Sequence, residues 1–282
     1  MLNRIGTAIL GFMVGRTLNR LIRFKKERMK LPSAIGLIFL SISLGFAQDV
    51  DTVNPDRPSF STSTHTVAKG EVQIEGGFTR LRSGSAVGYD VGQILVRDGV
   101  SKRVELRVGV PSYEIVDVPE GRATGADDVL VETKVLLMSR KRVALGALAS
   151  ASFPTGSREV AEHTFQPGAT LITDITVSDA VSVTCNAGYS RATTSGLRYN
   201  SVSGVSTANV SLSSTVSAFT EFFAFNQFHD RAQKYVGVGA ALRIGKRASI
   251  DASGGFGIRN RFDGPDRYFG AGISLVLTSS RD

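Results

Sequence analysis

The stretch Arg103-Val104-Glu105-Leu106-Arg107-Val108-Gly109-Val110 decides the fold class of this 282-residue chain. Its aliphatic residues occupy every second position and its charged residues lie between them, which is the period of a β-strand with two unlike faces. The same alternation recurs in twelve segments between residues 70 and 277. Each segment is close to the roughly 9–11 residues that a tilted membrane-spanning strand needs, and counts of ten or fourteen strands are also compatible with the pattern.

The connections between these segments alternate in length. Short turns are predicted at Arg97–Arg103, Ser139–Lys141, Ser178–Ala180, Ser213–Thr215 and Gly245–Arg247. Longer polar stretches are predicted at Arg80–Gly88, Pro111–Ala126, Pro154–Gly168, Ser190–Asn200, Asn226–Gln233 and Ile258–Arg267. Antiparallel strands with all short turns at one rim and all long loops at the other are typical of outer-membrane β-barrels, whose short turns are periplasmic and whose long loops are extracellular.

Alternation alone does not separate a membrane barrel from a soluble sandwich, because both have one apolar and one polar face. The glycines favour the barrel, since they fall mainly on the polar face, where they would weaken a solvated sheet but relieve crowding inside a closed lumen. They are Gly77, Gly92, Gly109, Gly188, Gly237, Gly239, Gly255, Gly257, Gly270 and Gly272. We therefore predict an all-β, antiparallel transmembrane barrel of about twelve strands.

The N-terminal 47 residues read as a leader. Met29-Lys30 opens a basic region, Leu31–Leu44 is apolar, and Gly45-Phe46-Ala47 supplies the small residues of a signal-peptidase site, so cleavage is expected after Ala47. Met29 could be the true start, or Ile5–Val14 could belong to a long leader. The predicted division is 1–47 leader, 48–69 periplasmic arm, 70–277 barrel and 278–282 tail.

The strong positive charge of the chain belongs mostly to this leader. Residues 1–47 hold eight of the 33 basic residues and one of the 25 acidic ones, so the rest of the chain is nearly neutral. The charge therefore does not predict a nucleic-acid partner. Cys185 is the only cysteine, which excludes an intramolecular disulfide.

Several short motifs resemble one bacterial outer-membrane family. They are Asp56-Arg57-Pro58, Thr66-Val67-Ala68-Lys69-Gly70, Val72–Gly77, Arg97–Val100, Val104–Pro111, Pro154-Thr155-Gly156-Ser157 and Tyr268–Gly272. In this order they resemble the family named for the meta-pathway of phenol degradation, over nearly all of residues 50–277. The resemblance implies an outer-membrane channel. The chain departs from the usual barrel ending, because it closes on Leu277-Thr278-Ser279-Ser280-Arg281-Asp282 and not on the aromatic residue that the barrel assembly machinery reads.

Two sets of side chains are expected to face the lumen. The first is a charge cluster on the first four strands, which could be a structural ladder of ion pairs or a charged constriction that selects permeants. It comprises Glu75, Arg97, Arg103, Glu105, Arg107, Glu132 and Lys134. The second set shares one parity on a single strand and could form an apolar path for aromatic or alkyl compounds. It comprises Phe219, Glu221, Phe223 and Phe225. Phe222 and Phe228 argue against a strict aromatic face.

Catalysis finds little support in the sequence. A barrel hydrolase needs a Ser or Thr nucleophile beside a histidine, but His163 and His229 fall in predicted loops and His65 in the arm. Asp127-Asp128 is a poor cation site by itself, and Gly255-x-Gly257 lies within a strand, where no nucleotide loop forms. We expect no enzyme activity, no cofactor and no metal site.

The sequence thus predicts an outer-membrane channel for the passive passage of small hydrophobic or aromatic molecules. Its partners would be outer-membrane lipids, the permeant and the barrel assembly machinery. A structural or adhesive barrel with a filled lumen stays open as an alternative, as does a membrane-embedded hydrolase.

Overall fold

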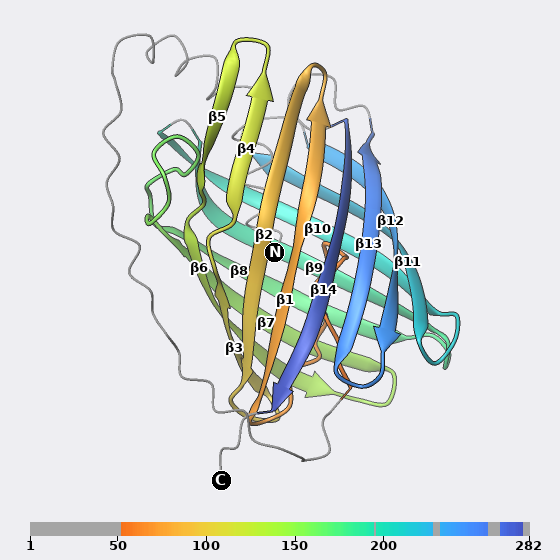
Figure 1. Ribbon diagram of the computed structural model, residues 1–282. Coiled ribbons are helices and arrows are strands. Elements are labelled where there is room, and N and C mark those ends of the chain that lie inside the picture. Colours follow the sequence, from red (N-terminus) through yellow and green to blue (C-terminus); the bar gives the residue numbers. More distant parts are fainter. Residues whose placement is uncertain (1–51, 195, 228–231, 259–265, 279–282) are drawn as a thin grey trace.

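A computed structural model describes residues 52–194, 196–227, 232–258 and 266–278. All of its regular structure is β-strand, arranged antiparallel in one sheet that closes on itself through the pairing of β1 with β14 (Figure 1). The strands are β1 (Glu71–Ser83), β2 (Ala86–Gly99), β3 (Val104–Gly109), β4 (Tyr113–Val118), β5 (Gly121–Ala126), β6 (Val129–Ser139), β7 (Val143–Phe153), β8 (Gln166–Thr176), β9 (Val181–Thr194), β10 (Leu197–Ser211), β11 (Val216–Gln227), β12 (Gln233–Ile244), β13 (Ala248–Gly257) and β14 (Arg267–Thr278). Within these described residues, no helix is long and apolar enough to cross a membrane.

The fourteen segments form a barrel of twelve strands, as the sequence predicts. Both β3 and β4 pair with β2, β3 along Leu95–Gly99 and β4 along Val87–Val91. Likewise β5 lies beside β4, and β6 lies beside β3. β3 and β4 together therefore form one barrel strand with an interruption, and β5 and β6 together form the next one.

The faces of the strands are those that the alternation predicts. On β3, Leu106 and Val108 point outward with nearly half of their surface exposed, whereas Glu105 and Arg107 are buried inside. An exposed apolar surface surrounds the wall, and a buried polar interior fills it. This arrangement, apolar outside and polar inside, is the reverse of that in a soluble protein, and a wall that faces lipid requires it.

At the rim of the predicted long loops, several connections differ from the expectation. The strands β1 and β2, and likewise β4 and β5, continue as hairpins with two residues between them, and the β9–β10 turn contains Gly196 at a φ of 81°. Polar residues in these stretches alternate well enough to extend the ladder, so the strands rise past the apolar band. A longer described connection, residues 154–165, joins β7 to β8.

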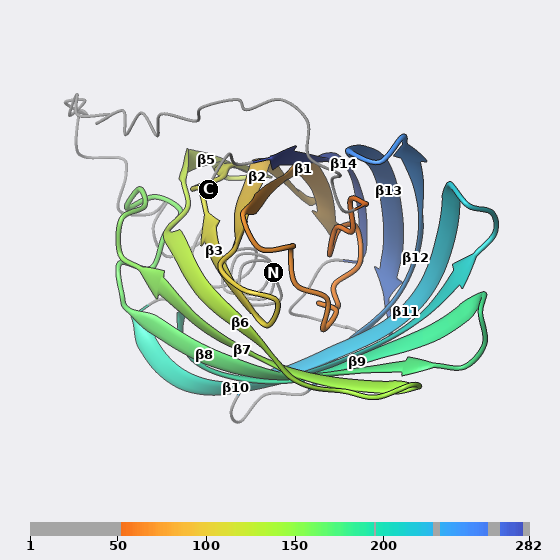
Figure 2. The ribbon, with the colours of Figure 1, turned by 90° about the horizontal axis from the view of Figure 1, so that it is seen from below.

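The segment before β1 lies inside the barrel (Figure 2). The sequence predicts a periplasmic arm at residues 48–69, but the described part of this segment is buried against the inner wall, with Asp56, Arg57 and Phe60 each at most 6% exposed. The physical reason is its hydrogen-bonding capacity: extended backbone rich in Ser and Thr can be satisfied by polar side chains that line a lumen.

Candidate functional site

The segment Asn54–Val67, called here the lumenal strap, crosses the interior of the barrel. Its backbone N–H groups donate to side chains of strands on opposite sides of the ring. Phe60 N donates to Glu221 Oε2 on β11 at 2.9 Å, Thr62 N to Asn186 Oδ1 on β9 at 2.7 Å, and Val67 N to Glu105 Oε2 on β3 at 2.8 Å. Because buried amides need acceptors, these inward side chains fix the path of the strap.

Other contacts extend this pattern. The amides of Asp56 and Arg57 donate to the two oxygens of Glu75, each at 3.2 Å. Thr64 donates through both its amide and its hydroxyl to Asp174 Oδ2, each at 2.6 Å. The strap is therefore held by β1, β3, β8, β9 and β11, which places it across the lumen and not along one wall.

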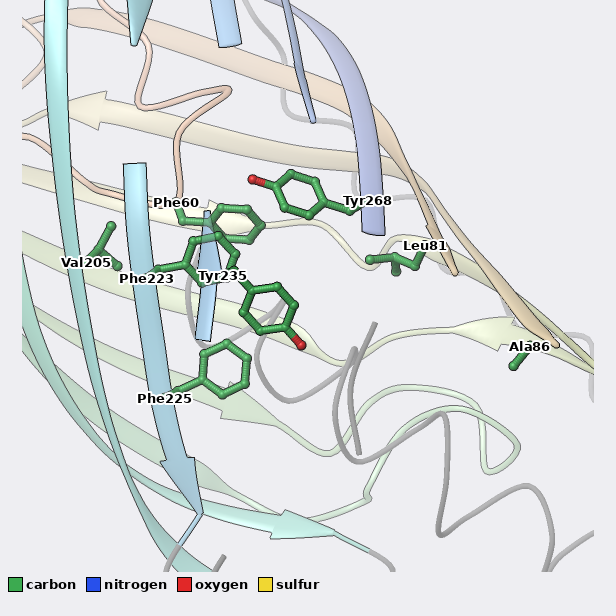
Figure 3. Close-up of a cluster of buried hydrophobic side chains, with 8 residues drawn as sticks. All are labelled: Phe60, Leu81, Ala86, Val205, Phe223, Phe225, Tyr235 and Tyr268. Atoms are coloured by element: carbon green, nitrogen blue, oxygen red, sulfur yellow. The ribbon is translucent and has the colours of Figure 1, made fainter. Parts of the chain in front are cut away.

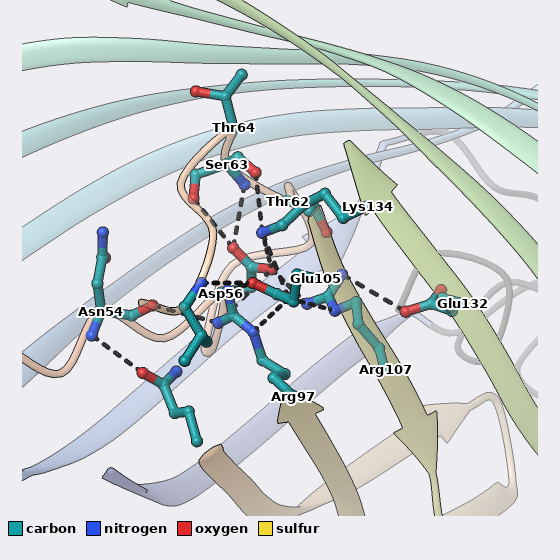
Figure 4. A network of polar contacts seen from close by, with 12 residues as sticks. Asn54, Asp56, Thr62, Ser63, Thr64, Arg97, Glu105, Arg107, Glu132 and Lys134 are labelled. Carbon is teal, nitrogen blue, oxygen red and sulfur yellow. Dashed lines mark hydrogen bonds and ion pairs between the residues drawn. The ribbon is translucent and has the colours of Figure 1, made fainter. Parts of the chain in front are cut away.

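Asp56 is the centre of a buried ionic cluster (Figure 4). Its carboxylate pairs with Arg107 of β3, and its Oδ2 lies 3.5 Å from Lys134 Nζ of β6 and 3.9 Å from Arg97 Nη1 of β2. Burial raises the pKa of Asp56, but the positive charge of Lys134 and of the two arginines outweighs burial and holds that pKa well below its usual range. The carboxylate is therefore ionised.

The wall residues of the cluster also pair with one another. Arg97 forms a bidentate contact with Glu105, at 2.8 and 3.0 Å, and reaches Glu75 at 2.6 Å. Arg107 lies 3.1 Å from Glu105 and 3.5 Å from Glu132. Six of the seven predicted cluster residues meet here, namely Glu75, Arg97, Glu105, Arg107, Glu132 and Lys134. Arg103 does not: it is exposed in the turn before β3, because the strand begins only at Val104.

Arg57 ties the strap to the seam between the first and last strands. Its guanidinium donates to Gln93 Oε1 on β2 at 3.0 Å and to Ala271 O on β14 at 3.1 Å, and lies 3.6 Å from Asp251 on β13. Gly77 and Gly272 make this position possible, since a Cβ on either would lie 2.5 Å from guanidinium nitrogens. These inward glycines thus create room for a charged side chain.

Aromatic rings gather around Phe60 of the strap (Figure 3). Phe60 of the strap packs on Phe223 of β11 with ring centroids 4.1 Å apart, and meets Tyr268 of β14 edge-on at 5.2 Å. Phe223 also stacks on Tyr235 of β12 at 4.8 Å, and Phe225 lies beside both. We call these five rings the aromatic cluster.

The predicted aromatic set of β11 is divided between two places. Glu221, Phe223 and Phe225 are buried within the lumen, and Glu221 accepts from Ser59 Oγ at 2.9 Å and from Tyr268 Oη at 3.2 Å. Phe219 lies nearer the short turns and lines a cavity instead. Phe222 is 43% exposed and points outward, and Phe228 lies outside the described residues.

This cavity of about 960 Å³ occupies the short-turn end of the lumen, bounded by the strap. Hydroxyls of Thr176, Ser182, Ser211 and Thr215 line it, together with Arg243. It has the size of a small-molecule site, and its lining mixes these polar groups with apolar side chains such as Leu136, Ala144 and Phe219. The cavity and the aromatic cluster therefore offer two chemically different surfaces within one lumen.

Sequence reasoning missed the residues that the strap brings. Asp56 and Phe60 have no periodic pattern around them. Alternation places Asp174, Asn186, Tyr235 and Tyr268 on the inward face of their strands, but it does not show that they contact a further segment. One signal was present: inward carboxylates such as Glu221 and Asp174 had no basic neighbour on adjacent strands. Unpaired inward acceptors of this kind indicate a further segment of chain inside the barrel.

The two described histidines lie on separate segments. His65 lies on the strap and His163 in the β7–β8 connection, and His229 falls outside the described residues. Among the described residues, no three His, Cys, Asp or Glu side chains are grouped as metal ligands would be.

The chain is similar in fold to solved outer-membrane barrels. An outer-membrane channel from Pseudomonas putida F1 is similar with a TM-score of 0.64 at 10% identity, over 80% of this chain and 100% of that one. The KdgM porin gives 0.52 at 10% identity, over 72% and 98%, and the NanC porin gives 0.51 at 10% identity, over 72% and 98%. No curated protein sequence matches the chain.

The fold and the inward-facing polar network define a twelve-stranded barrel of the outer-membrane class. Residues 55–277 match the family described as "Putative MetA-pathway of phenol degradation", and the chain belongs to that family.

Proposed function

We propose that this protein is an outer-membrane channel through which small hydrophobic or aromatic molecules pass passively, with the lumenal strap restricting the passage. The observation that carries the proposal is the aromatic cluster, whose rings face the lumen and not the lipid. Phe223 and Tyr235 are each 2% exposed although neighbouring Phe222 points outward.

The proposed route runs between the rim that carries the β1–β2 and β4–β5 hairpins and the cavity at the short-turn end. An aromatic permeant would first contact the aromatic cluster, where offset or edge-on ring contacts are favourable. It would then pass the strap and enter the hydroxyl-lined cavity, where a phenolic hydroxyl finds hydrogen-bonding partners. Phe60 lies at the junction of these two regions, so its displacement would open the route.

The test is permeation in reconstituted membranes. In planar bilayers, phenol should reduce the ion current through the protein more strongly than cyclohexanol, which has the same size and no aromatic ring. Liposomes with the protein should take up phenols faster than protein-free liposomes. The protein should accelerate the uptake of benzoate less than the uptake of phenols. Equal effects of phenol and cyclohexanol would remove the aromatic preference.

A second candidate, a structural or adhesive barrel with a filled lumen, is favoured by the ionic cluster. Its side chains and the strap occupy the interior, and a buried network of this kind can serve specificity of folding alone. The same experiment separates the two candidates, because a filled barrel would conduct no ions and accelerate no uptake.

A further inference from the structure

Positive charge is concentrated at the short-turn rim. The β2–β3 turn carries Lys102 and Arg103, the β6–β7 turn carries residues 140–142 (Arg-Lys-Arg), and the β12–β13 turn carries Lys246 and Arg247. All seven side chains are exposed. We call these three turns the basic arc.

The arc covers one side of the rim. In the ring, the strands from β12 through β14, β1, β2, β3 and β6 to β7 are continuous neighbours, and the three basic turns lie along them. The remaining short turns, Ser178–Ala180 and Ser213–Thr215, carry no basic residue, and Asp179 is the single carboxylate in all five turns. Glu71 and Asp98 at nearby strand ends are buried or half-buried.

Among the described residues of the opposite rim, basic and acidic side chains are mixed. Its β4–β5 hairpin carries the exposed pair Asp117–Arg122, and the β7–β8 connection carries Arg158 beside Glu159. A mixture of both signs screens itself, whereas the basic arc presents a field of one sign.

The height of the arc is set by the apolar surface. Val100, Leu137 and Ile244 are 43%, 53% and 54% exposed, and each precedes the first basic residue of its turn by two or three positions. At about 3.3 Å per residue in an extended chain, and less where the turn bends back, the charges lie within roughly 10 Å of the last apolar side chain. That is the layer of lipid headgroups next to the hydrocarbon, which long basic side chains reach readily.

We propose that the basic arc binds the phosphate groups of anionic phospholipids in the leaflet at the short-turn end, which is the periplasmic leaflet when the barrel has the usual orientation. The proposal rests on the membrane location of the barrel and not on its channel activity. Lipid would be held on the β12-to-β7 side and not around the whole rim.

The test uses the full-length mature protein in nanodiscs that contain phosphatidylcholine with increasing phosphatidylglycerol. Lipid that remains bound after mild extraction is counted by native mass spectrometry. The variants are Lys102→Gln with Arg103→Gln, and Lys246→Gln with Arg247→Gln. The matched control, Arg198→Gln with Arg267→Gln, removes two exposed charges from the opposite rim.

Wild type and control should retain phosphatidylglycerol over phosphatidylcholine, and each arc variant should weaken that retention by roughly ten-fold. Salt should reduce the preference in the wild type. Equal retention of the two lipids by the wild type, or equal loss in the control and arc variants, would overturn the proposal. An acidic protein captured by the arc in lipid-free detergent, with no lipid preference, would also overturn it. Ion current measured on the Lys246→Gln with Arg247→Gln variant, whose two residues do not line the cavity, reports channel function separately, and we expect it to be unchanged.

Discussion

Two parts of the lumenal strap, around Asp56 and around Phe60, are held by different interactions. Around Asp56, the strap meets fixed charges on β2, β3 and β6 that are fully buried and geometrically specific. Around Phe60, it meets rings on β11 and β14 that make non-directional contacts. A buried ion pair is costly to break from one side, whereas an aromatic contact can be exchanged for another aromatic contact. Asp56 is therefore the anchor of the strap, and the side chain of Phe60 is the part that can yield.

Removal of the strap should have the largest effect on the protein. Deletion of residues 54–66 should raise single-channel conductance several-fold, because the segment that crosses the lumen is gone. Planar-bilayer recording measures this directly, with Phe222→Ala as a control on the outer wall. Unchanged conductance would mean that the strap does not restrict the passage.

The anchor is tested by Asp56→Asn. The neutral side chain leaves Arg107 and Lys134 without a shared carboxylate, so the free energy of unfolding should fall by about 3–5 kcal/mol. Urea unfolding in detergent, followed by gel mobility, measures it. The control is Asp117→Asn, which breaks the exposed pair with Arg122 and should change stability little. Equal losses in the two variants would contradict the role of Asp56.

The role of the Phe60 side chain is tested by Phe60→Leu. This change keeps an apolar side chain but loses ring contacts worth about 0.5–1.5 kcal/mol per aromatic pair, so stability should fall less than in Asp56→Asn. Phenol should block the ion current to a different extent, because the ring of Phe60 no longer competes with phenol for contact with Phe223. A phenol response identical to that of the wild type would show that the permeant does not visit the aromatic cluster.

The smallest effect is expected for Arg103→Gln. Arg103 is exposed in a turn and is not part of the ionic cluster, so conductance, ion preference and heat resistance should match the wild type. Arg97→Gln serves as the contrast, because Arg97 contacts both Glu75 and Glu105. A selectivity change in Arg103→Gln would place that residue at the channel mouth after all.

The sequence predicted the parts of this molecule that depend on a period of two. Glu105 and Arg107 face inward because they alternate with Leu106 and Val108, and the parity of Glu221 placed Phe223 and Phe225 beside it. Arg103 shared that parity but lies beyond the end of its strand, where alternation no longer fixes direction.

The strap could not be predicted in this way. Its residues have no periodicity, and its position depends on acceptors that are far away in sequence, such as Asn186 for the amide of Thr62. Only a count of inward carboxylates without nearby cations would have suggested it.

Arg57 has a consequence for biogenesis. The acceptors that it reaches, Gln93, Ala271 O and Asp251, come from the beginning and the end of the barrel, so they converge only when β1 and β14 are joined in the native register. A chain that closes with a slipped register would leave this guanidinium buried without its partners. Arg57 thus finds all of these partners together only in a barrel that has closed in the native register.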